Sequence, residues 1–331
     1  HADCGLAAYA LASPEPDHYS MQIRMLNLGN GSEMLITAGG RKENHPRFSP
    51  DGNWLAFVSD AAGQDQIWLY EMASGSVRCL TDLPCGAGEP VWSPDGSRIC
   101  FVAEEPLSDG SGAADSEIVI IEDFGYKSEK AMGFAQKTAA HIWVVPLNGG
   151  PACRLTDGDR DHVMPAWSPD GNWLALASNR CRARSEYIGM DLFKVPAAGG
   201  EMCRLTENLW LAWYPKPFPP MFTPDGQTIV FAALAPSLAA GMPPTHLFRI
   251  PAGGGGAVSL WPADAPCHEA TCFIYNSENF GSFPGIAQIS EDGRQIYFLS
   301  GWHGASNIYR ANIFGDPRSE EHTSELQSRH N

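Results

Sequence analysis

Apolar and polar residues alternate in short runs along most of the chain, and each run ends at a cluster of Gly, Pro, Asp, Asn or Ser. Runs of about four to eight residues with this period of two are typical of half-buried β-strands. No run approaches the roughly 18 consecutive apolar residues that a transmembrane helix needs. The pattern therefore predicts an all-β protein without a membrane-spanning helix.

A four-residue sequence of Ser or Thr, Pro or Glu, Asp and Gly recurs between two such runs. Proline presets the backbone of the second turn position, Asp can hydrogen-bond to its own backbone, and Gly adopts the positive φ that closes a tight hairpin. We therefore predict that five Asp-Gly pairs close equivalent turns and have a structural role. These pairs are Asp51 and Gly52, Asp95 and Gly96, Asp170 and Gly171, Asp225 and Gly226, and Asp292 and Gly293.

Two other units recur in a fixed order after the turns. The first is an aromatic strand that ends in small residues, as in HIWVVPLNGG from His141, and the second contains Leu-Thr, as in CRLTD from Cys153. Together with the strands on either side of the turn, they give each module four antiparallel strands. Four strands per repeat of about 40–45 residues are typical of a β-propeller blade.

The modules add up to about six blade-equivalents, incomplete at both ends. GLAAYAL, YSMQIRMLNLGNG and EMLITAG, before the first turn, have the pattern of the last three strands of a blade. The last module continues only to Ile313 and lacks its Leu-Thr strand. Because each repeat buries its faces only against its neighbours, the ends of such an array need closing or capping. We therefore expect the sequence to be a fragment of a larger protein.

We assign residues 1–317 to the partial propeller, with an insertion at about 104–140 that has room for a hairpin. Residues 318–331 lack the alternating pattern and contain Leu326 as their only large aliphatic residue. Part of this tail, 318–328, resembles the in-frame translation of a sequencing-library adapter. We expect the tail to be artefactual or disordered and to pack against nothing, since ordering a backbone costs about 1–2 kcal/mol per residue.

The turn, the aromatic strand and the Leu-Thr strand together resemble the propeller repeat shared by the Tol-system periplasmic protein and the prolyl oligopeptidase family of serine peptidases. The insertion with Tyr126-Lys127 and Gly133-Phe134, and the run from Arg154 to Arg180, are similar to the acylaminoacyl-peptidase and dipeptidyl-peptidase branch. The uneven spacing of the turns also favours the peptidases, because the Tol protein has compact, evenly spaced blades. The resemblance covers residues from about 20 to 314.

In that family the propeller precedes an α/β-hydrolase domain with a Ser-Asp-His triad and limits which peptides reach it. The present sequence contains no Gly-x-Ser-x-Gly, the strand–turn–helix elbow that exposes the nucleophile. The nearest segment, Gly281–Gly285, has Phe283 in the place of the serine. The resemblance therefore implies no catalytic residue, cofactor or metal in this chain. It implies two partners, a hydrolase domain in cis and peptides in the intact enzyme.

Two classes of function stay open. The first is the non-catalytic N-terminal propeller of such a peptidase, which gates peptide access to the hydrolase domain. The alternative is a free-standing Tol-like propeller that acts as a protein-interaction module. A propeller enzyme with a site in its own central channel is a third class, and no cluster of polar residues in the sequence supports it.

The net charge of −16 narrows the choice of partner. Nucleic-acid phosphates demand clustered Lys and Arg, so we expect no nucleic-acid partner, and an anionic membrane surface would repel the chain. Nine cysteines, an odd number without a CxxC pair, predict neither a disulfide framework nor a zinc ribbon. Free thiols favour a reducing compartment, so we expect a cytoplasmic location. The sequence starts at His1 and cannot be judged for a preceding signal peptide.

Two groups of residues resemble metal sites. Cys267, His268 and Cys272 supply three possible ligands, which leaves a structural zinc incomplete. Asp157, Asp159 and Asp161, followed by His162, resemble an alternate-Asp calcium loop. In an EF-hand, however, glycine stands at position six and Glu at position twelve, and this segment has neither. A solvated turn is the interpretation that the spacing favours.

The remaining candidates have structural interpretations. Glu104-Glu105 and Glu320-Glu321 are acidic pairs, and some relatives hold a substrate amine with such a pair, but the sequence context differs here. The Gly253–Gly256 run opens no predicted helix, so a phosphate loop is not supported. Other residues occupy repeat positions or loops. Trp54, Trp92, Trp167 and Trp173 are expected in blade packing, and His162, His246, His268 and His303 in loops or at blade edges.

Overall fold

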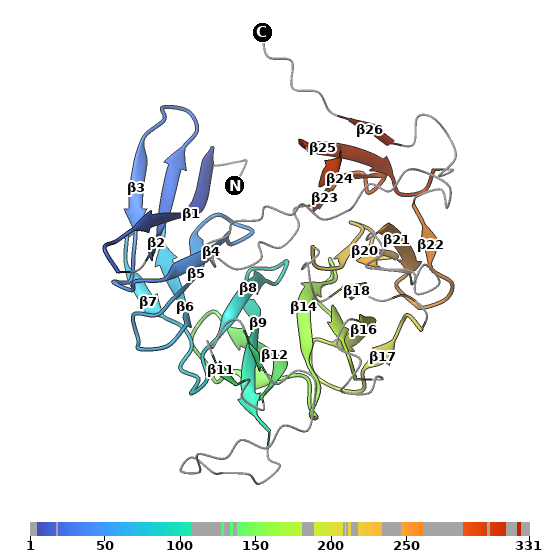
Figure 1. The fold of residues 1–331 in the computed structure, drawn as a ribbon, viewed down its shortest axis with the longest axis horizontal. Helices are drawn as coiled ribbons and strands as arrows, with labels where there is room; N and C mark the ends of the chain where they lie inside the picture. The colour runs from blue at the N-terminus through green and yellow to red at the C-terminus, as the bar shows by residue number, and fades with distance from the viewer. Residues whose placement is uncertain are drawn as a thin grey trace. The chain divides into compact units, whose positions relative to one another are not determined.

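The computed structural model (Figure 1) describes most of the chain. The described residues are 5–17, 19–107, 127–128, 133–134, 138–180, 189–207, 209, 211–212, 218–233, 246–260, 287–302, 305–315 and 323–325. Every helix or strand assigned among them is a β-strand, which confirms the all-β prediction. By their contacts the residues form two compact units, residues 1–107 with 138–159, and residues 108–137 with 160–331.

The first unit contains three antiparallel sheets whose strands follow one another in chain order. The first sheet has three strands, β1 (Leu6–Pro14), β2 (Tyr19–Asn27) and β3 (Glu33–Ile36). The second sheet has β4 (Glu43–Phe48), β5 (Trp54–Ser59), β6 (Gln66–Glu71) and β7 (Val77–Cys79). The third sheet has β8 (Gly88–Trp92), β9 (Arg98–Pro106), β12 (Thr138–Pro146) and β13 (Cys153–Arg154).

The second unit contains three more such sheets. The fourth sheet has β14 (His162–Trp167), β15 (Trp173–Ser178), β16 (Gly189–Pro196) and β17 (Cys203–Arg204), with β18 (Leu211–Ala212) also paired to β16. The fifth has β19 (Met221–Phe222), β20 (Thr228–Ala233), β21 (His246–Pro251) and β22 (Val258–Ser259). The sixth has β23 (Ala287–Ile289), β24 (Gln295–Trp302), β25 (Ala305–Asn312) and β26 (Thr323–Glu325).

These sheets confirm the prediction of six blade-equivalents, and the first sheet has the three strands expected of it. Within the insertion at 104–140, β10 (Lys127–Ser128) pairs with β11 (Gly133–Phe134) as a short hairpin. The sixth sheet differs from the expectation. Its fourth strand, β26, comes from the tail that we expected to pack against nothing, and it pairs with β25. Strand pairing uses main-chain groups, so an edge strand can pair with a segment that carries no Leu-Thr signature.

The first strand of the second, third and fourth sheets contains the same β-bulge. The register shifts between Asn44 and Arg47, and at the equivalent places in β8 and β14. Each bulge has a residue with positive φ directly before a proline: His45 (52°), Glu89 (57°) and Met164 (54°). Proline cannot donate a hydrogen bond to the ladder, and a bulge is one place where a strand accommodates it.

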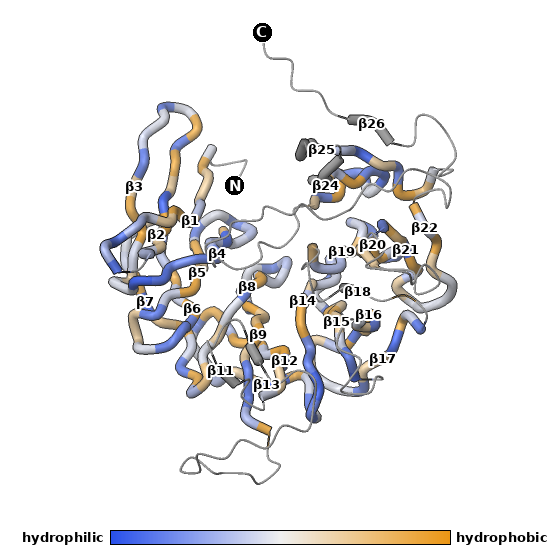
Figure 2. Tube along the Cα trace, viewed as in Figure 1, coloured by the Kyte–Doolittle hydropathy of each residue, from blue (hydrophilic) through white to orange (hydrophobic). Residues whose placement is uncertain are grey.

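The core of the first unit lies between consecutive sheets, because side chains alternate between the two faces of each strand. Leu55 and Phe57 of β5 pack with Ile23 and Ile36 of the first sheet. Ala56, between them, packs on the other side with the third sheet. Buried apolar residues recur along the middle strands of each sheet, as the orange segments of β9 and β12 illustrate (Figure 2). Each sheet is therefore stabilised by its neighbours, as a propeller blade is.

The second unit has a core of the same kind. Val230 and Leu247 of the fifth sheet pack with Ile296, Phe298 and Tyr309 of the sixth. The rings of Phe298 and Tyr309 lie 6.0 Å apart on neighbouring strands.

Candidate functional site

The five predicted Asp-Gly turns are closed by one set of hydrogen bonds. In the first turn, Ser49 Oγ donates to Asp51 Oδ1 at 2.5 Å and accepts from the N–H of Trp54 at 2.9 Å, while the Gly52 N–H donates to the Ser49 carbonyl at 2.9 Å. The hydroxyl–carboxylate bond recurs in the other turns, at 2.5–2.6 Å, from Ser93, Ser168, Thr223 and Ser290. All five glycines have φ of 68–71°. Sequence reasoning gave roles to Pro, Asp and Gly, and missed the hydroxyl.

These hydrogen bonds lower the pKa of all five aspartates. The largest cause in each is the Ser or Thr hydroxyl two residues earlier. Asp95 accepts hydrogen bonds from the hydroxyl and the N–H of Ser97 in addition to the one from the Ser93 hydroxyl. Together they lower the pKa of Asp95 to about 2. The carboxylates are exposed and are ionised at neutral pH, so each turn places one negative charge at the surface.

Neighbouring turns within each unit touch one another. In the first unit, a Cβ added at Gly96 would lie 3.6 Å from Cδ of Pro50 in the preceding turn. In the second unit, the same relation holds between Gly226 and Pro169 at 3.6 Å, and between Gly293 and Pro224 at 3.1 Å. The turns thus form a close-packed row along one side of each unit. We call this side of a sheet the compact-turn end.

The long connections lie at the opposite end of each sheet, because consecutive strands are antiparallel. They run between β9 and β12, between β15 and β16, between β20 and β21, and between β22 and β23. Most residues of these connections lie outside the described part of the chain. Binding and catalytic residues concentrate on long loops that a rigid scaffold positions. We therefore take this long-connection end as the candidate functional end of each sheet.

Threonines of the Leu-Thr units stabilise the long-connection end. Thr81 Oγ1 accepts a hydrogen bond from the N–H of Ile67 at 2.9 Å, at the start of the third strand. Thr156 and Thr206 make the same bond in the third and fourth sheets, at 3.0 and 2.9 Å. All three threonines are buried. The fourth strand of each of these sheets ends directly before its Leu-Thr. The threonine hydroxyl therefore adds one more hydrogen bond between the fourth and third strands, beyond the end of the fourth strand.

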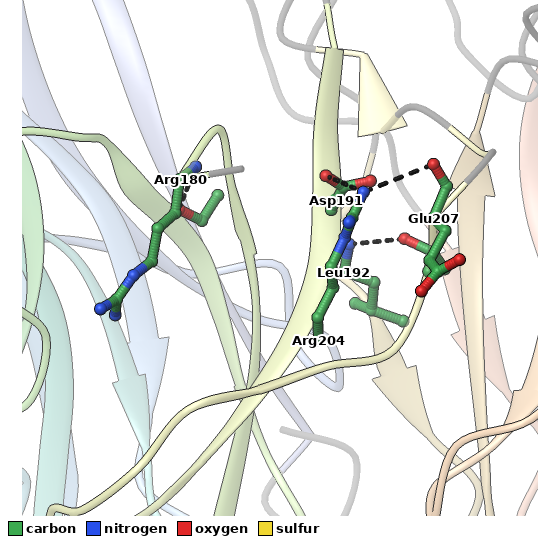
Figure 3. A network of polar contacts seen from close by, with 7 residues as sticks. Arg180, Asp191, Leu192, Arg204 and Glu207 are labelled. Atoms are coloured by element: carbon green, nitrogen blue, oxygen red, sulfur yellow. Dashed lines mark hydrogen bonds and ion pairs between the residues drawn. The ribbon is translucent and has the colours of Figure 1, made fainter. Parts of the chain in front are cut away.

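A buried acid in the fourth sheet belongs to the same arrangement (Figure 3). Asp191 directly precedes Leu192 in β16 and is fully buried. Its Oδ2 accepts a hydrogen bond from Arg204 Nη2 at 2.9 Å. Arg204 also contacts the Glu207 carbonyl at 3.4 Å (Figure 3). The equivalent position in the second sheet is Gln66, whose Oε1 accepts from the Thr81 hydroxyl at 2.7 Å.

The start of the second sheet contains a buried carboxylate that the sequence pattern did not indicate. Glu43 Oε1 accepts hydrogen bonds from the N–H of Ala38 at 2.7 Å and from the hydroxyl of Thr37 at 2.9 Å. The nearby Asp60 accepts from the N–H groups of Arg41 and Lys42 at 2.7 and 3.0 Å. Through these hydrogen bonds, the two acids hold the connection between the first and second sheets at the long-connection end of the second sheet.

One row of cross-strand neighbours in the fourth sheet contains a histidine, a serine and an aspartate, the residue types of a catalytic triad, but they are not arranged as a triad. His162 pairs with Ser178 across β14 and β15, and Ser178 pairs with Asp191 across β15 and β16. A triad needs the imidazole between serine and acid, and here the serine occupies the middle strand. All three residues are fully buried, so no substrate reaches the hydroxyl. The row is structural.

His162 corrects one expectation. It was expected to be exposed, in a loop or at a blade edge. It does begin β14, the edge strand of its sheet, but it is fully buried. The segment before the proline extends the strand toward the long-connection end. His246, at the start of β21, is partly buried, and burial lowers the pKa of its imidazole.

The acidic candidates do not converge on one point. Glu104 accepts a hydrogen bond from the Thr138 hydroxyl at 2.9 Å, whereas Glu105 forms an ion pair with Arg154. The side chains of neighbouring residues in a strand point to opposite faces of the sheet, so Glu104 and Glu105 cannot bind the same amine. Asp161 contacts Asn179, with its N–H donating at 3.0 Å. No group of three or more His, Cys, Asp or Glu within the described residues is placed to hold a metal ion.

Several other candidates fall outside the described residues. They are Cys267, His268, Cys272, Phe283, His303, Glu320 and Glu321. Gly253–Gly256 forms the turn between β21 and β22 and opens no helix. In the part of the chain that is described, no helix has the length and apolar character to span a bilayer.

The tryptophans take part in blade packing, as expected. Trp92 is buried and its indole N–H donates to the Arg47 carbonyl of the preceding sheet at 2.9 Å. Trp173 packs under the Lys194 ammonium, 4.5 Å from the ring centroid, and Lys194 donates to the Ala252 carbonyl of the next sheet at 2.6 Å. Sequence reasoning missed such cations between sheets, because the pattern does not reveal which neighbour a lysine reaches.

Comparisons with known proteins agree with this architecture. Residues 9–115 match the model of the PD40 family, described as the TolB beta propeller domain. The uncharacterised peptidase YuxL of Bacillus subtilis is 31% identical over 184 residues, which are 52% of this chain and 28% of YuxL. The chain thus spans less than a third of that relative.

Two solved structures share the fold. An acylaminoacyl peptidase of Pyrococcus horikoshii superposes with a TM-score of 0.67 at 16% identity, covering 98% of this chain and 44% of the peptidase. The β-propeller domain of the Trilobed protease from Pyrococcus furiosus superposes with a TM-score of 0.59 at 14% identity, covering 98% of this chain and 82% of that domain. Residues 9–115 therefore resemble the TolB beta propeller domain, and the chain has the β-propeller fold that is also found in acylaminoacyl peptidase.

Proposed function

We propose that the chain is the non-catalytic propeller domain of a serine peptidase of the prolyl oligopeptidase family, and that it gates peptide access to an α/β-hydrolase domain in the same protein. The observation that supports this most is the division of each sheet into two ends. The compact-turn end is uniform from blade to blade, whereas the connections at the long-connection end differ in length from one blade to the next. A gate needs a constant scaffold with a variable rim.

The relatives support the same proposal. The match covers 44% of the acylaminoacyl peptidase chain, so that protein has parts beyond the matched region. The described residues include free thiols at Cys79, Cys85 and Cys153, and on this basis we propose a cytoplasmic location.

The gene itself provides the first test. Reading the genomic DNA beyond the codon for Asp316 should reveal a continuing frame with a Gly-x-Ser-x-Gly elbow and downstream Asp and His codons. An early stop codon in the genomic frame would contradict the proposal.

Given the complete protein, a series of acyl-peptides of increasing length then tests gating. Short peptides should be cleaved and a folded protein substrate should not, and equal cleavage of both would remove the gate from the proposal.

A free-standing Tol-like interaction module is the second candidate. It is favoured by the match of residues 9–115 to the TolB propeller model. The two candidates differ in one observable. The module should capture a protein partner without any hydrolase domain, whereas the peptidase propeller should gain turnover when the domain is present.

A further inference from the structure

Asp-Gly bonds occur in this chain in two structural settings. Five belong to the repeat turns, and another, Asp157-Gly158, lies in the connection between β13 and β14 (Figure 2). Asp109-Gly110 is outside the described residues. Glycine has no Cβ to hinder its own amide nitrogen, so an Asp-Gly bond is open to attack by that nitrogen on the aspartate side chain.

The reaction is a dehydration followed by a hydrolysis. The glycine nitrogen bonds to Cγ of the aspartate, and the carboxyl OH leaves with the amide hydrogen as water, which gives a five-membered succinimide. Water then adds to one of the two ring carbonyls and breaks its bond to nitrogen. Opening at the side-chain carbonyl restores aspartate, and opening at the main-chain carbonyl gives isoaspartate. No oxidant or reductant is needed.

The repeat turns hold both reacting groups. The amides of Gly52, Gly96, Gly171, Gly226 and Gly293 each donate to the carbonyl of the turn Ser or Thr, at 2.8–2.9 Å. The carboxylates accept from the turn hydroxyl, which keeps them ionised and away from the neutral form that loses water. The two Asn-Gly steps are also held, because Gly31 and Gly149 donate to the carbonyls of Asn27 and Pro146.

Gly158 is in a different setting. It is exposed, its φ is 100°, and nothing lies within 4 Å of the position that a Cβ would occupy. Among the residues that the structure describes, its amide has no hydrogen-bond acceptor.

We propose that Asp157-Gly158 is a site of spontaneous isoaspartate formation, and that the hydroxyl clasp of the repeat turns protects their Asp-Gly bonds from the same reaction. The product has one more main-chain carbon in the connection between the third and fourth sheets. It also has a free α-carboxylate, which makes this segment a substrate for an isoaspartyl O-methyltransferase.

The test is to age the full chain at neutral pH and to map isoaspartate by peptide mass spectrometry, with methyltransferase labelling as a second readout. We expect isoaspartate at Asp157 to exceed that at each repeat turn several-fold, since the Gly158 amide is open to attack whereas the turn glycine amides are held by hydrogen bonds. A repeat turn that isomerises as fast as Asp157 would overturn the proposal. Ageing in urea should remove the difference, and a difference that persists in the unfolded chain would show that folding does not cause it.

Variants separate the two halves of the proposal. Asp157→Glu should abolish the signal at that site, because the corresponding ring has six members. Ser49→Ala should raise isomerisation at Asp51 toward the level of Asp157, while Ser49→Thr, which keeps the hydroxyl, should not. Should Ser49→Ala fail to fold, the comparison of folded and urea-treated wild-type chain still decides the matter. Unchanged isomerisation at Asp51 in a folded Ser49→Ala protein would contradict protection by the clasp.

Discussion

One hydroxyl group organises each repeat turn. It donates to the aspartate and accepts from the main chain five residues later, so it closes the hairpin from both sides. Thr223 does the same in the fourth turn, which explains why the motif tolerates Ser or Thr and nothing without a hydroxyl among the five copies. The positions of Asp and Gly could be predicted from turn chemistry alone, whereas the clasp required the coordinates of Ser49 and Trp54.

Ser49→Ala should therefore lower the free energy of unfolding by about 1–3 kcal/mol, because the buried N–H of Trp54 loses its acceptor. Urea denaturation monitored by tryptophan fluorescence measures the change. Ser49→Thr serves as the control and should stay near wild type. A loss in Ser49→Thr as large as that in Ser49→Ala would mean that the shape of serine, and not its hydroxyl, matters.

The aspartates make stability depend on pH in a defined direction. Their folded-state pKa values are lowered, so they stabilise the fold above the unfolded-state pKa and lose this contribution as pH falls through the folded value. For Asp95 the window lies between 3.8 and about 2. In Asp95→Asn, the unfolding free energy should change less steeply with pH in this window than in wild type. Identical slopes in urea titrations across the window would exclude a contribution from Asp95.

At the scale of strands, the period of two and the turn motif were sufficient to predict most of the four-stranded sheets. What could not be predicted depends on long-range packing. The bulges at His45, Glu89 and Met164 are set by the proline that follows within a paired strand, and β26 by an open strand edge. The burial of His162 depends on packing around β14, which the local sequence pattern does not encode.

The Leu-Thr units were recognised as strands, and the structure gives the threonine a specific task. Thr206→Val keeps the shape and removes the acceptor for the buried N–H of Leu192. We expect a loss of about 1–3 kcal/mol in the free energy of unfolding, with faster hydrogen exchange at Leu192. Thr206→Ser is the matched control and should retain most of the stability. Slow exchange at Leu192 in the valine variant would show that another group holds that amide.

Each sheet of the molecule has a uniform compact-turn end and a variable long-connection end. The net charge of −16 determines which classes of partner the surface attracts. We expect a chain with this excess of carboxylates to favour cationic or neutral partners over nucleic acid. The variable long-connection end is the part in which such a partner would find shape and chemistry that differ from blade to blade. The proposed gate and the Tol-like module both require this end.

The purified 331-residue chain should not react with a fluorophosphonate serine probe. A serine becomes a strong nucleophile when a neighbouring base such as histidine accepts its proton. Among the described residues, the row that combines Ser178, His162 and Asp191 is buried with the serine in the middle. A known serine peptidase in the same tube controls for probe quality. Labelling that maps to one serine, and disappears when that serine is changed to Ala, would overturn the non-catalytic assignment. Adding the hydrolase domain that we propose should give labelling at its elbow serine, and the propeller residues should stay unlabelled.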